Sequence, residues 1–130
     1  MKLDALLGKF PALKLERPPE LWEAETVEES LMELLEAMIA ATAADTLNVN
    51  NLVVDPPEDE PRGPNDIPEG EFVAFTVSGG DGSEPDGTWP GKSKLLAGLE
   101  RKLVYAGAQY AYVRSIHGRG SITVLLDRCA

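Results

Sequence analysis

One stretch of this sequence nearly matches a phosphate-binding pattern: Asp86-Gly-Thr-Trp-Pro-Gly-Lys-Ser93. The full pattern, G-x-x-x-x-G-K-[ST], wraps glycine amides around phosphates, and its lysine and helix N-terminus supply positive charge. In this chain Asp86 stands at the first glycine position and puts a carboxylate where phosphates would lie, while Pro90 removes one amide. We therefore do not expect a nucleotide hydrolase.

A simpler anion site can be formed by the residues that end this stretch. Lys92, Ser93 and Lys94 would place two cations and free backbone amides at the start of a helix. Arg114 and Arg119, further along the chain, could add positive charge to the same phosphate or nucleotide ligand. The alternative is an ordinary loop in which Ser93 only caps the helix, and we favour this simpler interpretation.

Residues that bind metals or catalyse reactions are few in this sequence. Asp81, Glu84 and Asp86 offer carboxylates in a glycine-rich loop, but calcium takes about six to eight oxygen ligands, and the EF-hand spacing is absent. His117 is the only histidine and lies in an expected turn, and Cys129 is the only cysteine. No catalytic arrangement can be argued from these residues, so we expect neither an enzyme nor a bound metal or cofactor.

A row of glutamates forms the other candidate site. Apolar residues recur at helical spacing after Thr26, and Glu29, Glu33 and Glu36 fall together on the opposite face. Most rows of this kind are solvated helix surfaces, which is the simpler interpretation. The functional interpretation is a docking face for a basic partner. Further glutamates add to the same negative field: Glu20, Glu23, Glu25 and Glu28.

The net charge of −10 on these 130 residues is unevenly distributed. Residues 18–90 carry 18 acidic groups and one basic group, whereas residues 91–130 carry seven basic and two acidic groups. Such asymmetry bears on partners rather than on the fold, and it favours a basic protein partner over nucleic acid. We expect a cytoplasmic protein, because no apolar run approaches the roughly 20 residues of a membrane span, no signal peptide is recognisable, and one cysteine permits no intrachain disulfide.

The C-terminal third has the clearest structural signals. Apolar residues recur at helical spacing here: Leu95, Leu99, Leu103 and Ala106. Ser93 is the expected N-cap of this helix, and Gly107 is the expected C′ residue just past its end. Two alternating runs, 109–116 and 121–127, surround a break at 117–120 that contains two glycines. This pattern predicts a helix followed by a β-hairpin.

The preceding part of the chain predicts the remaining elements. A short N-terminal helical segment is expected from the spacing of its leucines, and Thr26-Val-Glu-Glu29 is a capping-box pattern that begins a longer helix. The apolar face of that helix comprises Val27, Leu31, Leu34, Leu35, Met38 and Thr42. Strands are expected at 47–54 and 72–78, with loops at 55–70 and 79–91. The first loop is acidic and proline-rich, so we expect it to be flexible.

These elements predict a single α+β domain spanning residues 1–130. We expect a four-stranded antiparallel or mixed sheet with two main helices on one face, in the order α-β-β-α-β-β. The leading functional expectation is a non-enzymatic binding protein of inhibitor, immunity or adaptor type that engages a basic partner. The alternatives are a phosphate- or nucleotide-binding domain using residues 91–94, and a self-associating subunit.

Overall fold

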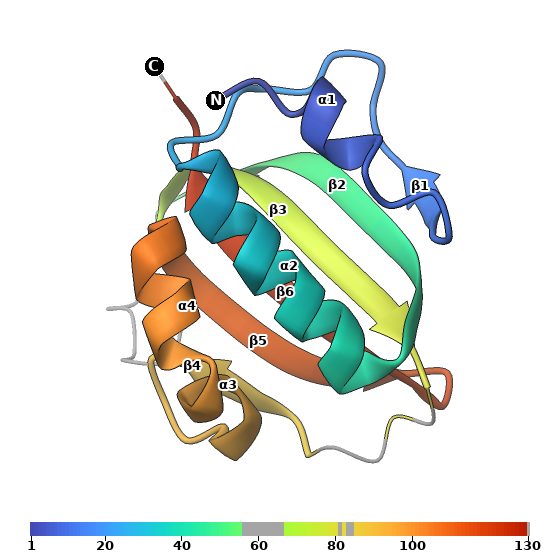
Figure 1. Cartoon of the computed structure of the whole chain (residues 1–130). Coiled ribbons are helices and arrows are strands. Elements are labelled where there is room, and N and C mark those ends of the chain that lie inside the picture. The colour runs from blue at the N-terminus through green and yellow to red at the C-terminus, as the bar shows by residue number, and fades with distance from the viewer. Residues whose placement is uncertain (56–66, 81, 83–84, 130) are drawn as a thin grey trace.

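The computed structural model describes residues 1–55, 67–80, 82 and 85–129 (Figure 1). The elements in chain order are α1 (Asp4–Leu7), β1 (Lys14–Glu16), α2 (Glu28–Thr42), β2 (Ala44–Val54), β3 (Gly70–Gly79), β4 (Gly87–Trp89), α3 (Lys94–Gly98), α4 (Glu100–Ala106), β5 (Ala108–Ile116) and β6 (Arg119–Asp127). The predicted α+β class is confirmed. Most of the loop predicted to be flexible, residues 56–66, lies outside the described residues. No helix in the described part of the chain is long and apolar enough to cross a membrane.

The sheet has six strands in the order β1-β2-β3-β6-β5-β4, so the prediction of four strands is wrong. The four predicted strands form its centre, where β2, β3, β6 and β5 pair antiparallel in that order. At one edge β1 pairs with β2 in parallel, which makes the sheet mixed, and at the other edge β4 pairs antiparallel with β5. The predicted order α-β-β-α-β-β is therefore incomplete.

The two strands that were not predicted are edge strands of three residues each. β4 lies within residues 79–91, for which the sequence predicted only a loop. A strand of this length has little propensity of its own and is stabilised mainly by pairing with its neighbour. The pairings Leu15 with Leu47 and Thr88 with Tyr112 join segments far apart in sequence, so local pattern could not indicate them.

Helix α2 buries the face predicted for it, except at its two ends, where Val27 is exposed and Thr42 is half-buried. Its fully buried residues are Leu31, Leu34, Leu35 and Met38. Val27 was predicted on this face but is the N-cap and is 63% exposed. The predicted capping box is also wrong, because Val27 takes the N-cap position without a side-chain cap bond, while Thr26 Oγ1 donates to the carbonyl of Ala106 at 2.7 Å. That bond joins the start of α2 to the end of α4.

The helix predicted after Ser93 is divided into α3 and α4, which meet at Leu99. Gly98 is the last residue of α3, and glycine weakens a helix because it loses the most conformational freedom on folding. The predicted ends of the helical region are confirmed: Ser93 Oγ accepts a hydrogen bond from the amide of Leu96 at 3.2 Å, and Gly107 ends α4 in the left-handed conformation with φ 82°.

Strands β5 and β6 form the predicted C-terminal hairpin. His117 and Gly118 make its turn with φ values of 51° and 77°. Positive φ at both central residues is the feature of two-residue turns whose twist matches that of the flanking strands. Along β5, Ala111 and Val113 belong to the main core, while the alternate residue Tyr110 belongs to a separate cluster, as strand alternation requires.

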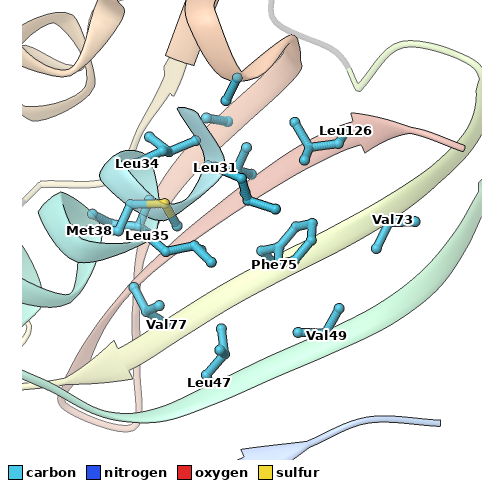
Figure 2. Close-up of a cluster of buried hydrophobic side chains, with 14 of the residues drawn as sticks. Leu31, Leu34, Leu35, Met38, Leu47, Val49, Val73, Phe75, Val77 and Leu126 are labelled. Carbon is cyan, nitrogen blue, oxygen red and sulfur yellow. The ribbon is translucent and has the colours of Figure 1, made fainter. Parts of the chain in front are cut away.

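The main core lies between α2 and one face of the sheet. Figure 2 shows Leu31, Leu34, Leu35 and Met38 of α2 gathered over side chains from three strands: Leu47, Val49, Val73, Phe75, Val77 and Leu126. Leu6 and Leu7 of α1 are buried in the same core, so the N-terminal segment covers one part of it. This packing places one side of α2 against the sheet and leaves its opposite side toward solvent.

The other face of the sheet carries a smaller apolar cluster made of Phe72, Ala74, Tyr110 and Leu125. Ile67, just before β3, packs against this cluster. Farther along the same strands this face is polar, and the hydroxyls of Thr76 and Thr123 form a hydrogen bond of 2.8 Å. An antiparallel sheet can leave one face without helices in this way, and in the described chain the helices lie on the main-core face (Figure 1).

Candidate functional site

The solvent side of α2 carries three of the predicted site residues. Glu29, Glu33 and Glu36 are all exposed, on the side of the helix opposite its buried leucines. Residues spaced by four and three lie above one another on a helix surface, so the three carboxylates form a continuous row about two turns long. We call Glu29, Glu33 and Glu36 the glutamate row.

The glutamate row forms no ion pair with any residue that the structure describes. The ion pairs between described residues use other carboxylates: Lys9–Glu28, Lys14–Glu16, Arg17–Asp4, Arg119–Asp45 and Arg128–Glu71. Like charges one helical turn apart repel by about 0.2–0.5 kcal/mol per pair. A cationic partner placed over the row would relieve this repulsion, which no described side chain does.

Three exposed apolar residues lie where the start of α2 meets the end of α4. Val27 is 63% exposed, Val104 is 56% exposed and Tyr105 is 66% exposed. The bond from Thr26 to Ala106 joins the sequence neighbours of Val27 and Tyr105. The two helices also lie side by side on the same face of the sheet (Figure 1). We call Val27, Val104 and Tyr105 the junction patch.

The junction patch was not predicted, although part of its signal is present in the sequence. The helical spacing of Leu99, Leu103 and Ala106 leaves Val104 and Tyr105 on the outer side of α4. Val27 could not be found in this way, because it was assigned to the buried face of α2. In the structure Val27 is the N-cap with an extended backbone, φ −109° and ψ 132°, so it is not part of the helical face.

The predicted anion site is brought together only in part. Lys92, Ser93 and Lys94 line a hollow of about 250 Å³ that also contains Asp86. The hydroxyl oxygen of Ser93 accepts the hydrogen bond from Leu96 and so caps α3, a helix of only five residues. The carboxylate of Asp86 weighs against an anion in this hollow, and the amide of Leu96 is already bonded to Ser93.

The arginines considered for that site are placed elsewhere. Arg119 pairs with Asp45 near the start of β2 and approaches the carbonyl of Ser78 at 3.5 Å. The guanidinium of Arg114 lies over the ring of Tyr112, 4.5 Å from its centroid, which is a cation–π geometry. Neither arginine lines the hollow at residues 92–94, so its positive charge comes from the two lysines.

The contact between Arg119 and Asp45 leads to a prediction about titration. Hydrogen bonds from Thr46 and Arg119, together with the charge of Arg119, lower the pKa of Asp45 below its ordinary value of 3.8. We expect an NMR titration of Asp45 to give a midpoint below that value. Arg119→Gln should raise the midpoint only partly, since Thr46 remains.

The same shift sets the direction of a pH effect on stability. A carboxylate with a lowered pKa in the folded state stabilises the fold above its ordinary pKa, and that contribution is lost as the pH falls through the folded-state pKa.

For the titration of Asp45, the control is Arg128→Gln, which removes the partner of Glu71 and should leave the Asp45 midpoint unchanged. An unchanged midpoint in Arg119→Gln would show that the pair does not form in solution.

The remaining residues singled out for chemistry do not gather into a centre within the described chain. Asp81 and Glu84 lie outside the described residues, and Asp86 Oδ1 accepts a hydrogen bond from the amide of Ser115 at 3.1 Å. No group of three or more potential metal ligands occurs among the described residues. His117 is exposed in the hairpin turn, and the amide of Cys129 donates to the carbonyl of Glu23 at 2.8 Å.

A separate hollow of about 360 Å³ lies at the end of α2. Its walls are formed mainly by small residues, from positions 40–43 together with Gly79, Gly80 and Gly82. Among the residues that the structure describes, this lining contributes no ionisable side chain. No protein-family model, curated protein or solved structure matches the chain, and its function has to be inferred from its own residues.

Proposed function

We propose that this protein is a non-enzymatic domain that binds a basic protein partner through the glutamate row of α2, in the manner of an inhibitor, immunity or adaptor protein. The observation that carries this proposal is the row itself. Its three carboxylates are exposed, lie on one side of α2, and form no ion pair with a described residue. The opposite side of the helix is buried in the core.

Charge gives such a surface a defined effect on binding. Complementary potentials steer a partner toward the correct face and raise the association rate, and this effect weakens as salt screens the charges. Because the other side of α2 is buried in the core, the backbone of the row is already ordered, and less backbone freedom is lost when the partner binds. The acidic central part of the chain enlarges the negative field around the row.

Reversing the row should weaken partner binding. The variant Glu29→Lys, Glu33→Lys, Glu36→Lys should fold normally, because its changes lie opposite the buried face of α2. We expect it to bind a basic partner captured from extract of the native host at least about tenfold more weakly, with a flatter dependence on salt. Titration of the purified pair at several salt concentrations measures both effects.

The matched control is Lys92→Ala with Lys94→Ala, which changes charges at the candidate anion hollow. Our proposal expects this variant to bind the basic partner normally. A phosphate- or nucleotide-binding domain would show the opposite result, with the lysine variant losing the ligand and the glutamate variant retaining it. Normal partner binding by the glutamate variant would refute the proposed function.

The alternative of self-association can be tested with the purified protein alone, because it predicts an oligomer. If the glutamate row met the basic C-terminal part of a second copy, the wild type would sediment as an oligomer at low salt and dissociate at high salt. The triple reversal would then sediment as a monomer under both conditions. A wild-type monomer at low salt is the result expected from our proposal.

A further inference from the structure

We infer that the junction patch is the apolar anchor for the same partner, which is therefore an amphipathic basic segment with large apolar side chains along one side. This inference rests on the proposed function of the glutamate row, and it adds the kind of segment that fits. The patch and the row belong to one continuous helical layer, since Val27 is the N-cap of the helix that carries Glu29.

Exposure distinguishes the junction patch from the rest of the described surface. Only two other large apolar residues are classed as exposed in the described chain, Leu15 at 39% and Val53 at 55%, and both lie on strands. The three patch residues instead gather at one helix junction. Grouped exposed apolar residues mark interaction sites more often than scattered ones, and tyrosine is enriched among the residues that dominate binding energy.

The charges around the patch indicate how the partner lies. Glu25 and Glu29 flank Val27 in sequence, and both are exposed without an ion pair to a described residue. Arg101 and Lys102 lie about one turn earlier on α4, farther from the end that joins α2. The partner's cations are therefore placed over α2, and its apolar side chains over the junction with α4.

The patch is held in place by contacts beneath it. Leu103 and Ala106 of α4 are buried, and the hydroxyl of Thr26 bonds to the carbonyl of Ala106 at 2.7 Å. Anchors fixed in this way bind without first losing much conformational freedom. The two surfaces should then act differently: the glutamate row governs association and salt dependence, while the apolar anchors govern how long the complex lasts.

Two synthetic peptides test this division. One is a lysine–leucine helical peptide of roughly 14 residues, or four turns, with leucines at every third or fourth position along one face. The other has alanine in place of each leucine, which keeps the lysines and the helix propensity but removes most of the apolar surface. We expect the leucine peptide to bind the whole protein about tenfold more tightly, as judged by calorimetry.

The protein variants locate that difference. Val104→Ser with Tyr105→Ser should reduce binding of the leucine peptide to the level of the alanine peptide, and should leave alanine-peptide binding unchanged. The control Val53→Ser removes an equally exposed valine from β2 and should change neither affinity. Since both patch residues are exposed, the double variant should fold, which circular dichroism verifies. Added salt should weaken the binding of both peptides, while the ratio of their two affinities should stay the same.

The outcomes separate this inference from the proposed function. If both peptides bind and both lose affinity on reversal of the glutamate row, but leucine gives no advantage, the junction patch is not an anchor and the proposed function stands. The same conclusion follows if the leucine advantage survives Val104→Ser with Tyr105→Ser. If reversal of the row affects neither peptide, the proposed function itself fails.

Discussion

Phe75→Ala should destabilise the fold by about 3–5 kcal/mol, the usual cost of removing a fully buried aromatic side chain. Phe75 has no exposed surface and lies at the centre of the main core under α2 (Figure 2). Its strand, β3, pairs on both sides, and Phe75 is opposite Val49 in β2 and Val124 in β6. Neither neighbouring strand can move into the vacated space without losing its own pairing, so most of the cavity should remain.

Urea denaturation measures this effect as a lower midpoint with an unchanged slope. Phe75→Leu keeps most of the apolar volume and should cost only about 1–2 kcal/mol. Val53→Ala, at an exposed position in β2, should stay within about 0.5 kcal/mol of wild type. A loss below about 1 kcal/mol for Phe75→Ala would mean that α2 does not pack over β3 as described.

Gly79→Ala should destabilise the fold by about 1–3 kcal/mol, because the added methyl group meets backbone rather than a flexible side chain. A Cβ atom at this position would lie 2.5 Å from the carbonyl oxygen of Ala43 and 2.7 Å from Cα of Ala44. These atoms belong to the tight connection between α2 and β2, where Ala43 takes the left-handed conformation with φ 48°. The methyl group can be accommodated only if the connection moves away from β3.

The same substitution at Gly98 should have the opposite sign. A Cβ atom there has no heavy atom within 4 Å, and Gly98 is helical. Alanine should stabilise the chain by about 0.4–1 kcal/mol, because it restricts the unfolded state without strain in the folded one. Thermal denaturation of the two variants beside the wild type measures both changes in stability, a loss for Gly79→Ala and a gain for Gly98→Ala. A neutral Gly79→Ala would show that α2 and β3 are farther apart at this connection.

Periodicity and local turn chemistry in the sequence were enough to determine several elements. The buried side of α2, the cap at Ser93, the end at Gly107 and the β5–β6 hairpin all follow from residues within a few positions of each other. The alignment of the glutamate row has the same origin, since spacing alone places Glu29, Glu33 and Glu36 on one face. Such features depend on short-range geometry, which does not change with the rest of the fold.

Tertiary structure alone decided the features that depend on distant partners. Strands β1 and β4 exist because β2 and β5 offer them unpaired edges. Thr26 matches a capping box locally, yet its hydroxyl bonds to the carbonyl of Ala106, 80 residues away, and Val27 takes the N-cap position instead. Arg119 likewise pairs with Asp45, 74 residues away, rather than joining Lys92 and Lys94. A hydroxyl or guanidinium bonds to whichever group the folded chain brings within reach, and the neighbouring sequence does not predict which group that is.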